Sequence, residues 1–293
     1  MRHTTHDMLL LFPVTNSKGK KMISKAVTTV LLAGFVAGIL FTGAQMLKVT
    51  PLILQAEKYE VGTEVVPHTH EQSGVTHEHE LNGVALDVHA ALTAAHGNEV
   101  AAHDHAGVAH DHAAENWAPA DGAERTFYTA VSNIVTGIAF SLMLVAVYLL
   151  RGKPVNMNSG LLWGAAGFLI FSGSPALGLP PELPGMTAAA LDARQTWWIG
   201  TVIATAIGIG LFTETKTILS KVAAVLLLAA PHLIGAPHPL LFESNVPAEL
   251  SAQFAIASLF TSAFFWMVLG ASTGYFYQKL VPETTEPLTT DSA

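Results

Sequence analysis

The sequence predicts an all-α protein: a polytopic helical membrane bundle of five to six transmembrane helices with a long His-rich extracytoplasmic loop. Three observations support this fold class. Hydrophobic residues make up 51% of the 293 residues and charged residues only 12%, about half the usual share in soluble domains. Long apolar runs recur along the chain, and most of the 14 histidines lie between the first two runs.

Each span is predicted from an apolar run that approaches the roughly 20 residues needed to cross a bilayer as a helix. The runs cover 24–47, 126–150, 158–173, 196–212, 218–234 and 248 to about 277. The third and fifth are short and meet prolines, which end or interrupt helices. The predicted order is an unstructured extension (1–21), a first helix (22–48), the loop (49–125), the remaining helices (126–280) and a polar tail (281–293).

The placement of lysine and arginine predicts the orientation, because basic residues concentrate on the cytoplasmic side. With six spans and both termini cytoplasmic, ten basic residues lie inside and four outside. The four are Lys48, Lys58, Arg125 and Arg194. We therefore expect a multi-pass protein of the inner (plasma) membrane, with the histidine-rich loop outside.

The loop between the first two spans contains ten histidines, eight of them in His-x-His pairs. The eight are His68, His70, His77, His79, His103, His105, His110 and His112. Neutral imidazole is a ligand for Zn, Cu, Fe and Ni, and histidine-rich tracts are a compositional sign of metal binding. A solvated spacer and a response to acidic pH are the alternatives. Apart from one short helix, we expect this loop to be largely disordered.

Four further candidate ligands flank the later spans at the outer side: Glu182, His232, His238 and Glu249. Ionisable groups at membrane depth are functional candidates. The two carboxylates also have structural explanations. The proline-rich segment around Glu182 either re-enters the membrane or lies on its surface, Arg194 pairs with Glu182 or Glu249, and Glu249 suits the positive end of a helix dipole.

Polar and small residues within the spans are expected to pack helices together. Gln45 and Asn133 either hydrogen bond between helices or line a path. Gly34 and Gly38, Gly160 and Gly164, and Gly270 and Gly274 have the spacing that lets helix backbones approach closely.

Several classes are disfavoured by the residues present. The chain has no cysteine and a net charge of −8, so thiolate metal sites and nucleic-acid partners are not expected. It has no His-Glu-x-x-His motif, no serine-based elbow and no phosphate-binding P-loop. We expect no catalytic residues, no enzyme activity and no tightly bound cofactor.

The sequence resembles the CbtA family of cobalt transporter subunits over about residues 22–280. The segments that carry the resemblance are "SKAVTTVLLAGFVAGILFTGAQ", "ALGLPPELPGM", "ARQTWWIGT", "PHLIGAPHP" and "VPAELSAQFAIASLF". The resemblance implies an integral membrane protein, commonly described with five spans, that works beside CbtB, a small one-helix protein with a histidine-rich end.

The resulting hypothesis is a membrane subunit that takes up a divalent metal. Co²⁺ is favoured by the resemblance, and Ni²⁺ or Zn²⁺ suits imidazole–carboxylate sites equally. The loop would capture the ion transiently outside, and the lipid bilayer and a CbtB-type subunit would be the partners. The alternative is a membrane protein that binds or senses metal without transporting it.

Overall fold

The computed structural model describes residues 17–60, 119–239 and 244–281. The chain divides into two units, Met1–Glu64 with Pro119–Ala293, and Val65–Ala118. The described residues belong to the first unit. The eight His-x-His histidines, residues 1–16 of the extension and residues 282–293 of the tail lie outside them, so the predictions made for those residues remain predictions.

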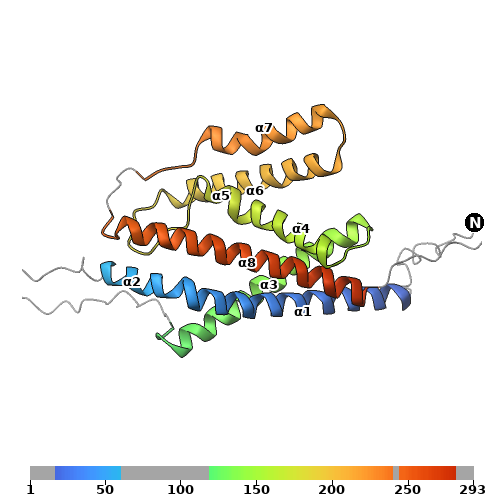
Figure 1. Ribbon diagram of the computed structural model, residues 1–293, viewed down its shortest axis with the longest axis horizontal. Helices are drawn as coiled ribbons and strands as arrows, with labels where there is room; N and C mark the ends of the chain where they lie inside the picture. The colour runs from blue at the N-terminus through green and yellow to red at the C-terminus, as the bar shows by residue number, and fades with distance from the viewer. Residues whose placement is uncertain (1–16, 61–118, 240–243, 282–293) are drawn as a thin grey trace, which may run out of the picture. The chain divides into compact units, whose positions relative to one another are not determined.

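The described residues form a series of helices (Figure 1). In chain order these are α1 (Ser17–Lys48), α2 (Thr50–Glu60), α3 (Ala123–Arg151), α4 (Met157–Phe168), the π-helix η2 (Leu169–Gly173), α5 (Ser174–Ala176), α6 (Leu191–Glu214), α7 (Ile218–Ile234) and α8 (Ala248–Leu280). An isolated bridge between Met186 and Ser244 is the β pairing found among them. The predicted all-helical class is thus confirmed for this part of the chain.

Four of these helices are long and apolar enough to cross a membrane: α1, α3, α6 and α8. Helix α7 is a shorter apolar helix with the predicted bounds, Ile218–Ile234. The predicted third span is divided into α4, η2 and α5, which run continuously from Met157 to Ala176. At 1.5 Å per residue this segment is about 30 Å long, the thickness of a bilayer's hydrocarbon core.

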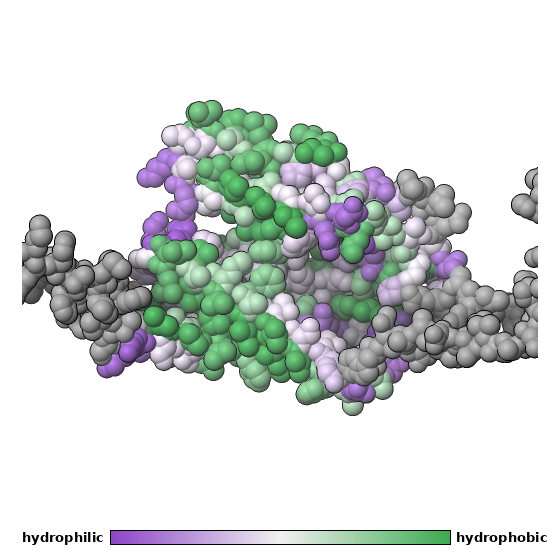
Figure 2. Space-filling view, turned by 180° about the vertical axis from the view of Figure 1, so that it is seen from behind, coloured by the Kyte–Doolittle hydropathy of each residue, from purple (hydrophilic) through white to green (hydrophobic). Residues whose placement is uncertain are grey.

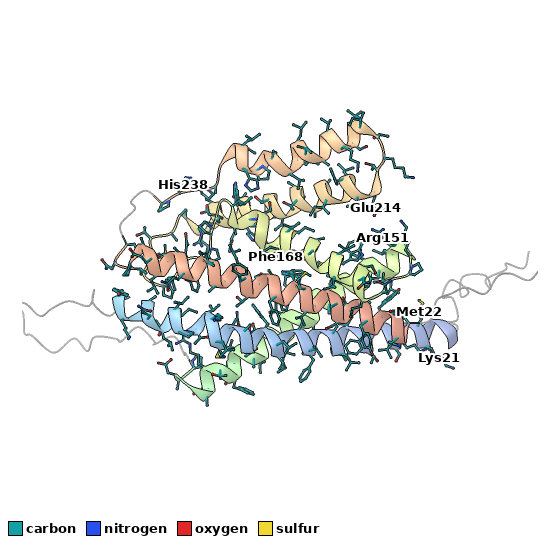
Figure 3. All side chains as sticks on the ribbon, viewed as in Figure 1. Lys21, Met22, Arg151, Phe168, Glu214 and His238 are labelled. Carbon is teal, nitrogen blue, oxygen red and sulfur yellow. The ribbon has the colours of Figure 1, made fainter. Side chains whose placement is uncertain are left out.

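The long elements run alternately in opposite directions, so the bundle has two distinct ends (Figure 1). At one end, here called the basic end, α1 begins, α3 meets α4, α6 meets α7 and α8 finishes. Lys21, Arg151 and Glu214 mark it in Figure 3. At the other end, called the loop end, α2 finishes and α3, α6 and α8 begin. The predicted outer residues Lys48, Lys58, Arg125 and Arg194 belong to the loop end.

Glycines at helix crossings let backbones meet without intervening side chains. Helix α1 packs on α3 and α8, and α4 packs on α8. A Cβ on Gly34 would lie 2.5 Å from Cα of Ile138 in α3. The pairs Gly160/Gly164 and Gly270/Gly274 meet each other across the α4–α8 crossing. All three predicted glycine pairs therefore act as packing surfaces.

The main core joins these crossings with large aromatic side chains. Trp266 of α8 is 1% exposed and Tyr148 of α3 is fully buried, and the Tyr148 hydroxyl lies 3.3 Å from Oγ1 of Thr273. Asn133 of α3 donates to Oε1 of Gln45 at 2.7 Å and to Oγ1 of Thr42 at 3.0 Å. The predicted interhelical hydrogen bond between Gln45 and Asn133 is therefore formed, while their role in lining a path remains a prediction.

The surface of the bundle is apolar, as expected for helices surrounded by lipid. Exposed side chains include Leu31, Phe35, Val135, Leu162 and Phe260. Figure 2 shows apolar residues covering much of one face. Such a large apolar surface would be unusual on a soluble protein.

Two segments differ from the predicted boundaries. Helix α1 begins at Ser17, so residues 17–21 are helical rather than part of an unstructured extension. Residues 50–60, predicted as loop, form α2 and continue the direction of α1. Its residue Ala56 is fully buried in a second hydrophobic cluster with Leu183 and Leu250. Burial of this face stabilises α2, although its apolar stretch is too short to span a membrane.

Candidate functional site

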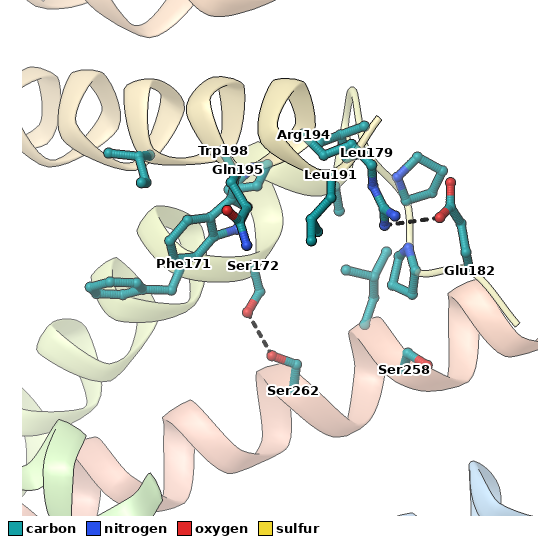
Figure 4. A pocket seen from close by; sticks show the side chains of 16 residues that line it. Phe171, Ser172, Leu179, Glu182, Leu191, Arg194, Gln195, Trp198, Ser258 and Ser262 are labelled. Atoms are coloured by element: carbon teal, nitrogen blue, oxygen red, sulfur yellow. Dashed lines mark hydrogen bonds and ion pairs between the residues drawn. The ribbon is translucent and has the colours of Figure 1, made fainter. Parts of the chain in front are cut away.

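The feature that stands out at the loop end is an open cavity of about 690 Å³ between η2, α5, the segment after α5, α6 and α8. Figure 4 shows it from close by. Its walls are mostly apolar and include Phe171, Leu179 and Trp198. Polar groups are few, which is typical of sites where small molecules bind.

Serine hydroxyls form the polar part of the cavity wall between η2 and α8. Oγ of Ser172 lies 2.8 Å from Oγ of Ser262. Ser258, one turn earlier on α8, also lines the cavity, and its buried Oγ has no hydrogen-bond partner within the described part of the chain. A buried hydroxyl without a partner is uncommon, because losing its hydration without compensation costs free energy.

An ion pair occupies the opposite side of the cavity. Nη2 of Arg194, in the first turn of α6, lies 2.9 Å from Oε2 of Glu182, and the two side chains are 32% and 24% exposed. Arg194 therefore pairs with Glu182 and not with Glu249, which resolves the predicted alternatives. The segment that carries Glu182 packs through Leu183 on Leu250 near the start of α8. It thus packs against the start of α8, and the choice between re-entry into the membrane and a surface location remains a prediction.

His232 of α7 lies on the other side of α5, in a hydrogen-bond network that connects α5, α6 and α7. Its Nε2 is 3.2 Å from Oγ of Ser174 in α5, and the same Oγ accepts a hydrogen bond from Thr205 of α6 at 3.0 Å. The indole of Trp197 packs edge-on against the His232 ring and donates to the carbonyl of Pro231 at 3.2 Å. This network holds the C-terminal end of α7 against α6.

The π-helix separates the two polar clusters. In η2 the backbone N–H of Ser174 bonds to the carbonyl of Leu169, five residues earlier. This inserts an extra residue into the helical turn. Ser172 consequently contacts α8, whereas Ser174 contacts α6 and α7. Short π-helical turns occur frequently at functional sites.

The four candidate ligands outside the loop are not assembled into one site. His238 and Glu249 are exposed, and Glu249 lies in the first turn of α8. Figure 3 shows His238 between α7 and α8. Across residues 17–60, 119–239 and 244–281, no three histidine, aspartate or glutamate side chains are grouped so that they could hold a metal ion. A ligand role for each therefore remains a prediction.

A further ion pair connects the two helices that flank residues 61–118. Arg125 of α3 contacts Oε1 of Glu57 in α2 at 2.6 Å and Oδ1 of Asp121 at 3.0 Å. Glu57 precedes residues 61–118 and Arg125 follows them. The ion pair therefore holds the two flanks of the histidine-rich segment together.

Sequence reasoning did not identify Ser172, Ser258 or Ser262 in the cavity, nor the hydrogen-bond partners Ser174 and Thr205. Serine and threonine are common in membrane helices, where they also bond to backbone carbonyls of the preceding turn. Their positions inside otherwise apolar runs were a weak signal. The directions in which Ser172 and Ser174 face depend on the π-helix, which no pattern in the sequence indicates.

The apolar helices, the glycine crossings and the polar cavity at one end define a polytopic helical membrane protein. A comparison with protein families is more specific. The model of the CbtA family, described as a probable cobalt transporter subunit, matches residues 23–278. The chain belongs to this family, and the resemblance drawn from its sequence segments is confirmed.

Membership of this family supports a role in cobalt transport across a membrane, and the word subunit implies a partner. Searches of curated proteins and of solved structures gave no match.

Proposed function

We propose that this chain is the membrane subunit of an uptake system for a divalent metal, with Co²⁺ as the favoured cargo. The observation that carries the proposal is the family match over residues 23–278. Helices that can span a membrane and the absence of recognisable catalytic motifs from the sequence agree with it. The metal is cargo and not a resident cofactor, so weak and transient contacts are what transport requires.

The proposed route begins outside the membrane at the histidine-rich loop. Imidazoles of the His-x-His pairs would capture the ion, and Glu182 would accept it at the cavity. The orientation behind this order, with the loop end outside and both termini cytoplasmic, is supported by the segregation of basic residues to the opposite end. His232, His238 and Glu249 are proposed as secondary contacts at the same end.

A small one-helix subunit of the CbtB type is the proposed partner. The lipid bilayer surrounds the remaining apolar surface. Since the chain has no phosphate-binding P-loop, energy from a nucleotide would have to come through another protein.

Uptake of radioactive Co²⁺ into proteoliposomes, with and without the small subunit, tests the proposal. Glu182→Gln should lower uptake strongly, because it keeps the size of the side chain but removes its charge. Glu214→Gln is a matched control: Glu214 also pairs with an arginine, Arg151 at 2.6 Å, but at the basic end. Equal uptake by wild type and Glu182→Gln would remove Glu182 from the route.

The alternative function is metal binding or sensing without transport. It is favoured by the lack of a three-ligand group in the described bundle, since a sensor needs ligands only in the loop. Binding of Co²⁺ by the purified protein without any uptake, even with the small subunit present, would favour this alternative.

A further inference from the structure

Arg194 occupies a position that its own helix disfavours. It lies in the first turn of α6, which begins at Leu191, and a helix N-terminus carries partial positive charge that repels a cation. The Ala190 position before the helix supplies no side-chain cap. The ion pair with Glu182 therefore holds the guanidinium in place.

Glu182 is the more rigidly held member of the pair. Pro180 and Pro181 precede it, and proline restricts the backbone to a narrow range of φ. The next residue, Leu183, is 3% exposed in the second hydrophobic cluster, and its N–H donates to the sulfur of Met186. Arg194 instead reaches the carboxylate through a long side chain with many rotamers. Separation of the pair would therefore occur by movement of Arg194.

The cavity next to the pair offers oxygen atoms to a cation. The hydroxyls of Ser172, Ser258 and Ser262 line it together with Glu182. Oγ of Ser258 is buried and lacks a partner among the residues described. With the guanidinium in place the pair is neutral overall, and the cavity has little attraction for an ion.

We propose that Arg194 is an internal competitor for the cargo: a divalent cation reaches Glu182 only by displacing the guanidinium. This inference rests on the proposed function and adds a source of charge selectivity to it. A monovalent ion replaces one positive charge with another and loses a charge-assisted hydrogen bond. A divalent ion brings a second charge, and so it can displace Arg194 where Na⁺ or K⁺ cannot.

The test uses the full-length protein in detergent and Co²⁺ alone as the probe. Trp198 lines the same cavity, and bound Co²⁺ quenches nearby tryptophan fluorescence. Subtracting the titration of Trp198→Phe isolates the signal of this cavity from metal bound to the loop. In Arg194→Gln the quenching midpoint should fall by about fivefold, the factor expected for a partly exposed ion pair, and Na⁺ should now compete.

Three matched variants decide the interpretation. Arg194→Lys keeps the charge and should titrate like wild type, and Arg194→Met replaces the glutamine variant if that protein does not fold. Arg194→Gln combined with Glu182→Gln should lose the gain completely. An unchanged or higher midpoint in Arg194→Gln, or a lysine variant that behaves like it, would overturn the inference.

The titration is independent of transport. Failure of Co²⁺ uptake in proteoliposomes would contradict the proposed function and leave the quenching result to judge Arg194 on its own.

Discussion

Replacing Gly270 with alanine should force α4 and α8 apart. A Cβ at this position would lie 2.7 Å from both Cα and N of Gly164, and closer still to the carbonyl oxygen of Gly160. These are backbone atoms, so no side chain can rotate to make room. Carbon atoms pack favourably at about 3.5–4.0 Å, and the helices must therefore separate by about 1 Å.

The cost of this separation can be estimated. Inserting a methyl group into a well-packed interior costs about 1–3 kcal/mol, whereas the better helix propensity of alanine returns up to about 1 kcal/mol. We expect the free energy of unfolding to fall by about 1–2 kcal/mol. Uptake should fall as well. Ser172 lies in η2, which continues α4, and its contact with Ser262 of α8 would be lost when the two helices separate.

Unfolding by sodium dodecyl sulfate in mixed micelles, followed by circular dichroism, measures the change. Gly43→Ala in α1 is the matched control, since a Cβ there has nothing within 4 Å. It should leave stability unchanged or raise it slightly. If Gly270→Ala unfolds at the same detergent fraction as Gly43→Ala, the glycine crossing does not determine how closely these helices pack.

Three other predictions concern topology, the loop and the buried amide. The chain has no cysteine, so an introduced thiol reports its own side: Lys58→Cys should react with an impermeant maleimide added outside, Lys153→Cys should not, and the opposite result would invert the orientation. A peptide of residues 64–116 should bind Co²⁺, Ni²⁺ or Zn²⁺ weakly in calorimetry at neutral pH and release it as the pH falls, because imidazolium cannot ligate; absence of heat at neutral pH would leave the segment as a spacer. Asn133→Leu should lower the free energy of unfolding by about 1 kcal/mol, since Gln45 and Thr42 lose their donor, and an unchanged stability would mean that these bonds contribute nothing.

The spans could be predicted from the sequence because membrane helices are specified by local composition. The bounds of α7 agree to the residue, and α8 begins at the predicted Ala248. Helix α2 could not be predicted in this way. It is short, and the cluster that stabilises it draws on Leu183 and Leu250, which are far away along the chain.

The sequence allowed individual residues of the candidate site to be predicted, but not the contacts between them. Local sequence identifies Glu182, Arg194 and His232 as polar groups near the ends of spans, but a partner is chosen by tertiary packing. His232 bonds to Ser174, which is 58 residues away, and Glu182 pairs with Arg194 rather than leaving it to Glu249. The sequence alone gave equal support to both pairings of Arg194.

Because of the π-helix, the number of residues in the segment Met157–Ala176 determines which way the side chains after it face. Each residue of an α-helix turns the chain by about 100°, so one residue inserted or removed between Ser172 and Ser174 would rotate all that follows. Ser174 would then face away from His232 and Thr205, while Ser172 before it kept its contact with Ser262. A substitution here alters one wall of the site, but a change of one residue in length would disconnect its two halves. Among sequences that share this architecture, insertions and deletions should therefore be rarer in this segment than substitutions.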